Sequence, residues 1–223
     1  MKKYFPSRSQ GRFQCVNRKD HKWLYSVCRT IIKAIHHNIS SHENDIAAQW
    51  CVKPTFVERS EDPVITWLGH STFLIQVGGK NILTDPILGT LSYIFSRIIP
   101  SIVSVKDLPP IDYVLISHNH LDHMDANTLH ALKNRFSDMF VCVPMGDKPW
   151  FEKNNFKNVS EHMWWDVILS GAGVNFSFLP ANHWSQRTMF DKNKSLWGSW
   201  MIQYAQTSIY FAGDTADGKH FDD

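Results

Sequence analysis

The segment SHNHLDHMD, from Ser117 to Asp125, concentrates side chains that bind metals. Four potential ligands lie within six residues: His118, His120, Asp122 and His123. They follow the apolar run Tyr113–Ile116, so they crowd a turn at the end of a buried strand, where a site can open to solvent. Imidazole and carboxylate together suit zinc and other borderline metals. The segment therefore predicts a metal site rather than a polar turn with incidental histidines.

The spacing within this segment suggests how the ligands divide. His118 and His120 alternate, so they point the same way if strand geometry persists to that position. Asp122 and His123 lie beyond the turn and can then face a second metal.

Two further candidates also follow apolar runs. His183 follows Phe176–Pro180 in PANHWSQR, and Asp214 follows Ile209–Ala212 in YFAGDT. Gly213 lets the backbone turn sharply before Asp214, and a carboxylate can bridge two cations. Alone, each would be read as a loop residue. In this order after HxHxDH, and at comparable strand ends, they are predicted ligands.

Three other polar residues carry less weight. Asp85 in LTDP either accepts a proton from a ligating imidazole or caps a turn before Pro86. His70 in GHST lies in a turn between two strands and either faces the site or is structural. His220 in DGKHF is better interpreted as a loop histidine.

The elements that must position these side chains are mostly strands. Gly78-Gly79 predicts a hairpin turn. Helix Ala126–Phe136 is predicted with Asp125 as its N-cap. Eight short β-rich runs separated by turn residues predict strands: Val64–Leu68, Phe73–Val77, Asn81–Thr84, Tyr113–Ser117, Phe140–Pro144, Val174–Leu179, Ser199–Tyr204 and Ser208–Ala212. Many strands with a few helices indicate a layered α/β domain.

Residues 1–60 differ from this pattern. Trp23–His37 has apolar residues at helical spacing and predicts one amphipathic helix. We therefore divide the chain into an N-terminal helical extension, 1–60, and an α/β domain, 61–223.

Composition limits the classes of protein that fit. The 223 residues are 43% hydrophobic, enough for one sizeable core. The net charge of +2 comes from mixed charges without a Lys/Arg stripe, so no nucleic-acid partner is expected. The sequence shows no signal peptide and no run of about 18 apolar residues. The four cysteines are widely spaced, which favours a cytoplasmic protein: Cys15, Cys28, Cys51 and Cys142.

The connection Ile87–Val105 is rich in apolar residues and leaves two interpretations. It packs on its own domain, or it forms a hydrophobic lip. Such a lip would dip into a bilayer interface, which makes the protein peripheral to a membrane, or would hold acyl chains beside the metals.

Through HxHxDH, the later His183 and Asp214 in GDT, the chain resembles the metallo-β-lactamase superfamily. Within it, the chain resembles the branch of N-acylphosphatidylethanolamine-hydrolysing phospholipase D and its bacterial relatives. The segments that carry the narrower match span about 63–219: TWLGHSTFLIQ, ILTDPI, LPPIDYVLISHNHLDHMD, HWSQRTMFDKNKSLWGSW and YFAGDT.

The resemblance implies an αββα sandwich with two zinc ions. By position, His118, His120 and His183 would hold one zinc, Asp122 and His123 the other, and Asp214 would bridge both. A water between the metals would attack the phosphorus of a phosphodiester, with Asp122 orienting that nucleophile. Asp122 and Asp214 are thus the expected catalytic residues.

The chain departs from the family pattern after GDT. Family members continue through further elements and supply another histidine to the second metal, whereas this chain ends at Asp223. We therefore expect a metallo-β-lactamase-like domain that is truncated, with a sandwich incomplete at the C-terminus and a second zinc short of one ligand.

Three functions follow as hypotheses. The first is a zinc-dependent phosphodiesterase acting on a phospholipid or a related small phosphodiester. The second is a hydrolase of another bond on the same fold, such as a lactone or a sugar-phosphate lactone. The third is a non-catalytic truncated fragment. A homodimer is left open as a further partner.

Overall fold

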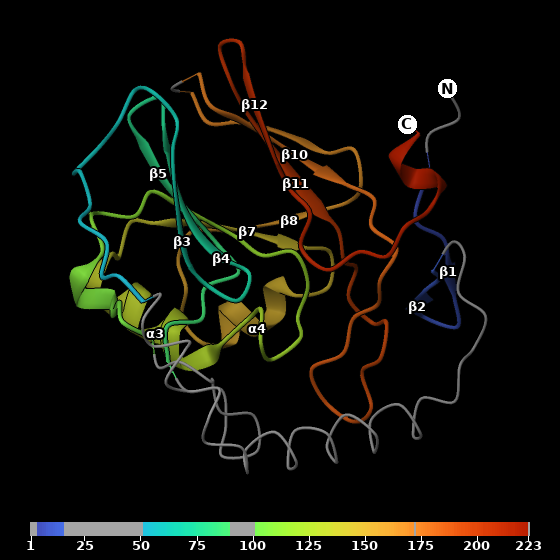
Figure 1. The fold of residues 1–223 in the computed structure, drawn as a ribbon. Helices are drawn as coiled ribbons and strands as arrows, with labels where there is room; N and C mark the ends of the chain where they lie inside the picture. The colour runs from blue at the N-terminus through green and yellow to red at the C-terminus, as the bar shows by residue number, and fades with distance from the viewer. Residues whose placement is uncertain (1–3, 16–50, 90–100, 172, 223) are drawn as a thin grey trace, which may run out of the picture.

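The structure is a computed structural model, and it describes residues 4–15, 51–89, 101–171 and 173–222. Two sheets face each other, and the helices lie beside one of them (Figure 1). Among the described residues, no helix is long and apolar enough to cross a membrane.

The larger sheet has six strands in the order β3-β4-β5-β6-β7-β8. The first three strands are antiparallel, and β5 to β8 run parallel. The carboxyl ends of β5, β6 and β7 therefore meet at one edge of the sheet. The strands span Val64–Gly69, Thr72–Val77, Lys80–Thr84, Tyr113–Leu115, Phe140–Pro144 and Val159–His162.

The smaller sheet has four antiparallel strands in the order β12-β11-β10-β9. Because β10 and β12 flank β11, they run in the same direction, and their carboxyl ends also share an edge. The strands span Val167–Leu169 (β9), Asn175–Leu179 (β10), Ser199–Tyr204 (β11) and Thr207–Phe211 (β12).

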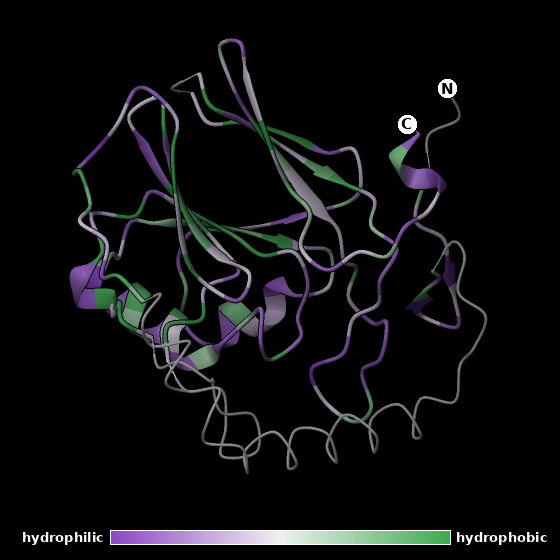
Figure 2. Cartoon of the chain, in the orientation of Figure 1, coloured by the Kyte–Doolittle hydropathy of each residue, from purple (hydrophilic) through white to green (hydrophobic). Residues whose placement is uncertain are grey.

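Two apolar clusters hold the layers together. One lies between the sheets and includes the fully buried Trp197, Trp200 and Phe176. The other lies between the six-stranded sheet and helices α3 (Ala126–Arg135) and α4 (Lys148–Lys153). The strands at the centre, such as β7, are the apolar segments of the fold, and hydrophilic residues gather in the outer turns (Figure 2). Helices, sheet and sheet are thus stacked as in an αββα sandwich, and no α-helix among the described residues covers the outer face of the second sheet.

Most predicted elements are confirmed. All eight predicted strands are present within two residues of their expected ends. Gly78 and Gly79 form the β4–β5 turn with φ of 56° and 65°, which a side chain would disfavour. The N-cap of α3 is also confirmed, because the Asp125 carboxylate accepts a hydrogen bond from Thr128 N at 2.9 Å.

Several short elements were not predicted. These are α4, β8 and β9, the two-residue strands β1 (Arg8–Ser9) and β2 (Arg12–Phe13), and the 3₁₀ turns Val105–Asp107 and Lys219–Phe221. They are too short for a periodic pattern to develop, so tertiary contacts decide them.

Part of the N-terminal extension packs on the domain. Phe13 is 1% exposed and belongs to the cluster between the sheets, and its backbone N–H donates to Asn193 O at 2.7 Å. The predicted helix Trp23–His37 lies outside the described residues.

The apolar connection after β5 is described only at its two ends. Ile87, Leu88 and Val103 are buried in the domain. The segment 90–100, which holds the centre of the predicted lip, lies outside the described residues.

The described cysteines Cys15, Cys51 and Cys142 are free thiols, and Cys28 lies outside the described residues. Burial raises the pKa of Cys142 to about 12, so this thiol stays protonated and unreactive at neutral pH.

Candidate metal centre

The HxHxDH segment leaves the carboxyl end of β6 and folds into a tight turn. The N–H groups of His123 and Met124 both donate to the carbonyl of His120, at 3.1 and 2.9 Å. This turn brings Asp122 and His123 back towards the strand end from which His118 projects. A short polar loop with two local hydrogen bonds thus presents four side chains at one edge of the sheet.

His118, His120 and His183 form what we call the first donor group. Their ligand atoms all lie within 4.8 Å of one another. Nε2 of His118 is 2.8 Å from Nδ1 of His120, and Nε2 of His183 is 3.3 Å from the same atom. Burial, together with the neighbouring histidines, lowers the pKa of His118 well below its usual value. The buried imidazole is therefore neutral, the form that binds metals.

His70, Asp122 and His123 form the second donor group, whose ligand atoms also lie within 4.8 Å of one another. Nε2 of His70 is 3.3 Å from Oδ2 of Asp122. Burial opposes ionisation of Asp122, but His70 and His123 outweigh it and lower the pKa of this carboxyl to about 2. Asp122 is therefore ionised at neutral pH.

Asp214 lies between the two donor groups. Its Oδ1 is 3.4 Å from Nε2 of His123, and its Oδ2 is 3.7 Å from Nε2 of His183. Gly213 makes this placement possible, because its φ is +58° and an added Cβ would lie 2.6 Å from Cβ of Ser117. A side chain at position 213 would push the end of β12, and Asp214 with it, away from the loop after β6.

Asp85 lies behind the second donor group at the end of β5. It is fully buried, and its carboxylate is 2.8 Å from Nδ1 of His123. It also accepts hydrogen bonds from the N–H and hydroxyl of Ser117, at 2.7 and 2.5 Å. This leaves Nε2 of His123 directed towards Asp122 and Asp214, which is the orientation a ligand needs.

The protonation of this pair follows from the number of donors. Burial raises the pKa of Asp85, but three donors face its carboxylate, so we assign it as ionised. Burial lowers the pKa of His123, but Asp85, Asp122 and Asp214 outweigh it and raise the pKa to about 9. Without a metal, His123 is therefore protonated at neutral pH.

The cluster fits a divalent cation. Nε2 of His123 is buried and makes no hydrogen bond to any described residue, while two carboxylates face it at 3.4 and 3.9 Å. A buried nitrogen in this setting is costly unless a cation or proton occupies it. Imidazole and carboxylate donors in this number suit zinc, iron or manganese.

The structure brings the predicted site residues together. The six predicted ligands gather at one edge of the two sheets, with Asp85 behind them and His70 beside them. Of the two interpretations of Asp85, the geometry shows the hydrogen bond to an imidazole. His220 belongs to neither donor group, and its Nε2 lies 3.0 Å from the Thr215 hydroxyl.

A second layer of residues was not predicted. The ring of Trp184 lies 4.2 Å from that of His120. Arg187 donates to Met124 O at 2.7 Å, and its guanidinium lies 4.8 Å from the centre of the Trp150 ring. The available signal was the motif HWSQRT, in which Trp184 and Arg187 follow His183 at fixed spacing.

A buried polar pair also lies beside the HxHxDH loop. Asn119, between two predicted ligands, donates to Oδ1 of Asp147 at 2.9 Å. Burial raises the pKa of Asp147 to about 7. Asn119 Oδ1 and Asp147 Oδ2 find no hydrogen-bond partner within the described chain, and a buried polar atom without a partner lowers stability.

Comparison with known proteins agrees with this geometry. A family model described as a beta-lactamase superfamily domain matches residues 80–222. The chain belongs to the metallo-β-lactamase superfamily. The structure of Igni18, a metallo hydrolase from Ignicoccus hospitalis, matches with a TM-score of 0.54 at 23% identity, over 68% of this chain and 60% of that one. This likeness shows the fold.

Two curated relatives match this chain at moderate sequence identity. The chain is 31% identical over 163 residues to N-acyl-phosphatidylethanolamine-hydrolyzing phospholipase D 1 of Caenorhabditis elegans, covering 67% of this chain and 46% of that protein. It is 35% identical over 175 residues to the mitochondrial enzyme of that name from Saccharomyces cerevisiae, covering 73% and 37%. The chain thus spans less than half the length of these relatives.

Proposed function

We propose that this metallo-β-lactamase superfamily member is a zinc-dependent phosphodiesterase that hydrolyses a phospholipid or a related phosphodiester. The observation that carries the proposal is the pair of donor groups joined by Asp214, whose two oxygens face His123 and His183. Sites for two metal ions occur in phosphatases and nucleases, among other hydrolases.

Bound divalent ions would supply Lewis-acid activation of water and of the phosphoryl group. The chain supplies the rest. Asp214 sets the distance between the two donor groups, and Asp85 fixes the ring of His123 through Nδ1. Asp122 is ionised at neutral pH, so its carboxylate can accept a hydrogen bond from an attacking water and orient it.

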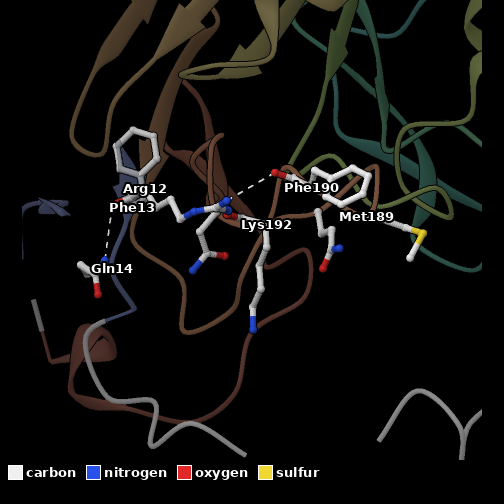
Figure 3. A pocket seen from close by; sticks show the side chains of 8 residues that line it. Arg12, Phe13, Gln14, Met189, Phe190 and Lys192 are labelled. Carbon is white, nitrogen blue, oxygen red and sulfur yellow. Dashed lines mark hydrogen bonds between the residues drawn. The ribbon is translucent and has the colours of Figure 1, made fainter. Parts of the chain in front are cut away.

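A pocket beside the site supports an anionic, partly apolar substrate (Figure 3). It carries two cations and no acidic side chain, and the exposed Met189 and Phe190 add apolar surface. Lys192 lies 5.7 Å from the centre of the Trp184 ring, which in turn contacts His120. Lys192 of the pocket and His120 of the first donor group thus contact the same Trp184 ring. The residues that line the pocket are Arg12, Phe13, Gln14, Gln186, Met189, Phe190, Lys192 and Asn193.

The curated relatives support the same substrate class, since both are named for hydrolysis of N-acyl-phosphatidylethanolamine. Contact with a membrane through 87–105, a cytoplasmic location and a homodimer stay predictions.

Replacing Ile94, Phe95 and Ile98 with Ser should reduce binding to phospholipid vesicles while the fold persists. Unchanged binding would show that this segment does not contact the membrane.

The substrate class is tested with three compounds in parallel: bis-p-nitrophenyl phosphate, vesicles containing N-acyl-phosphatidylethanolamine, and a simple lactone. We expect hydrolysis of the phosphodiesters, its loss with a chelator, its recovery with Zn²⁺, and none in His118→Ala. Hydrolysis of the lactone alone would show that the chain is a hydrolase of another bond and not a phosphodiesterase. No hydrolysis with any added divalent metal would favour a non-catalytic fragment.

A further inference from the structure

His70 occupies an unfavourable backbone conformation. It is the first residue of the two-residue turn His70-Ser71 that joins β3 to β4, between the paired Gly69 and Thr72. Its φ is +48°, a left-handed value that Gly, Asn or Asp adopt more easily at this position. A residue persists in such a conformation only where the surrounding contacts hold it there.

The turn is braced so that the side chain keeps one direction. The indole N–H of Trp67 donates to the carbonyl of His70 at 2.8 Å, although the Trp67 side chain is largely exposed. A large aromatic side chain is thus held on the surface by the turn that carries His70. This arrangement fixes the backbone from which the imidazole projects.

The imidazole of His70 is directed into the metal centre. Its Nε2 lies 3.3 Å from Oδ2 of Asp122, and its ring centre lies 4.9 Å from that of His123, in an edge-on arrangement. Within the described chain, the side chain of His70 contacts these two residues of the centre, and this accounts for its direction. The side chain is 42% exposed, so solvent or substrate also reaches this side of the centre.

If His70 is counted as a donor, the two metal positions have equal numbers of protein donors. The first donor group offers three nitrogens and Asp214 Oδ2, at 3.7 Å from His183. With His70 the second offers two nitrogens, the Asp122 carboxylate and Asp214 Oδ1, at 3.4 Å from His123. Four protein donors complete a tetrahedral zinc site, or leave one position for water if the metal expands to five.

We propose that His70 is a direct ligand, through Nε2, of the metal held by Asp122 and His123. This inference rests on the proposed metal-dependent function and names the ligand set of its second metal. It adds the β3–β4 turn to the segments that supply ligands. The other ligands come from segments further along the chain.

Metal titration of the chelator-treated 223-residue protein tests the assignment. The variants are His70→Ala and His70→Gln, where the amide can still hydrogen-bond to Asp122 but is a poor ligand. His130→Gln is the matched control, because His130 lies on α3 and packs against Trp150 and Phe156. Zn²⁺ binding is followed by competition with a chromophoric chelator, and Co²⁺ binding by its visible absorption.

We expect the wild type and His130→Gln to bind two ions per chain. Both His70 variants should bind the first ion normally and the second at least about tenfold more weakly, with a changed Co²⁺ spectrum. If His70→Gln binds the second ion as tightly as the wild type, His70 is a hydrogen-bond partner of Asp122 and the assignment is wrong. A wild type that binds one ion, unchanged in the variants, also overturns it while leaving metal dependence intact. A wild type that binds none overturns the proposed function as well.

Discussion

At the scale of residues, the metal centre depends on the hydrogen bonds that orient each ligand side chain. Nδ1 of His123 is hydrogen-bonded to Asp85, and its Nε2 faces Asp214 in the cluster. Its place in HxHxDH was visible in the sequence, because four ligand types within six residues are hard to explain otherwise. The sequence does not decide the role of Asp85, because a carboxylate before proline fits a turn equally well and only the fold brings residues 85 and 123 together.

Replacing Asp85 with Asn should weaken metal binding. The amide keeps the size of the carboxylate but removes the charge that orients His123, so we expect the affinity of the second metal to fall by about 10- to 100-fold. Competition with a chelator measures the change. A variant with wild-type affinity would show that Asp85 only stabilises the turn, and thermal unfolding of the metal-free variant tests that role separately.

The protonation of His123 predicts a pH dependence. Its pKa of about 9 in the metal-free fold lies above the ordinary value, so metal binding at pH 7 must displace a proton. Metal affinity should therefore rise with pH up to about 9. The contribution of the Asp85–His123 ion pair to metal-free stability is complete below about pH 6.5 and is lost as pH rises through 9. Calorimetry in buffers of different ionisation enthalpy should detect proton release, and its absence at pH 7 would contradict the assignment.

At the scale of elements, the site is assembled from strand ends. The carboxyl ends of β5 and β6 supply Asp85 and the HxHxDH loop, and those of β10 and β12 lead to His183 and Asp214. This much was predictable, because each candidate follows an apolar run. The contacts that α4 and the loop before it make with the site were not predictable. Lys148–Lys153 is a helix of six residues, which is too short for a periodic pattern.

Arg187 should act as a positioning residue that ties two of these elements together. It follows His183 by four residues and binds the carbonyl of Met124, next to His123. We expect Arg187→Met to weaken binding of at least one metal by about tenfold, and Arg187→Lys to recover part of the loss. The exposed Arg135, whose guanidinium lies over Phe136, gives the matched control Arg135→Met. Equal metal affinities in Arg187→Met and Arg135→Met would exclude this role.

At the scale of the whole molecule, the two sheets are joined by buried tryptophans. Trp200 of β11 lies between the sheets and donates its indole N–H to the carbonyl of Ile116, just before the HxHxDH loop, at 2.9 Å. The sequence predicts both strands but not this contact, because nothing in it relates residues 116 and 200. The second sheet therefore supports the metal loop directly, as well as supplying His183 and Asp214.

Trp200→Phe should test this support. Phenylalanine retains most of the apolar contact but leaves the Ile116 carbonyl without its donor, so we expect a loss of about 1–3 kcal/mol in the free energy of unfolding. Denaturant titration of the metal-free chain measures it. A change below about 0.5 kcal/mol, the size of an ordinary surface substitution, would show that the hydrogen bond adds little and that packing alone joins the sheets.

The count of metal ions per chain tests the central claim most directly. Elemental analysis of the purified 223-residue protein, dialysed against metal-free buffer after loading with Zn²⁺, should find two zinc ions per chain. His118→Ala should retain fewer. One ion or none in the wild type would contradict a binuclear centre built from His118, His120, Asp122, His123, His183 and Asp214.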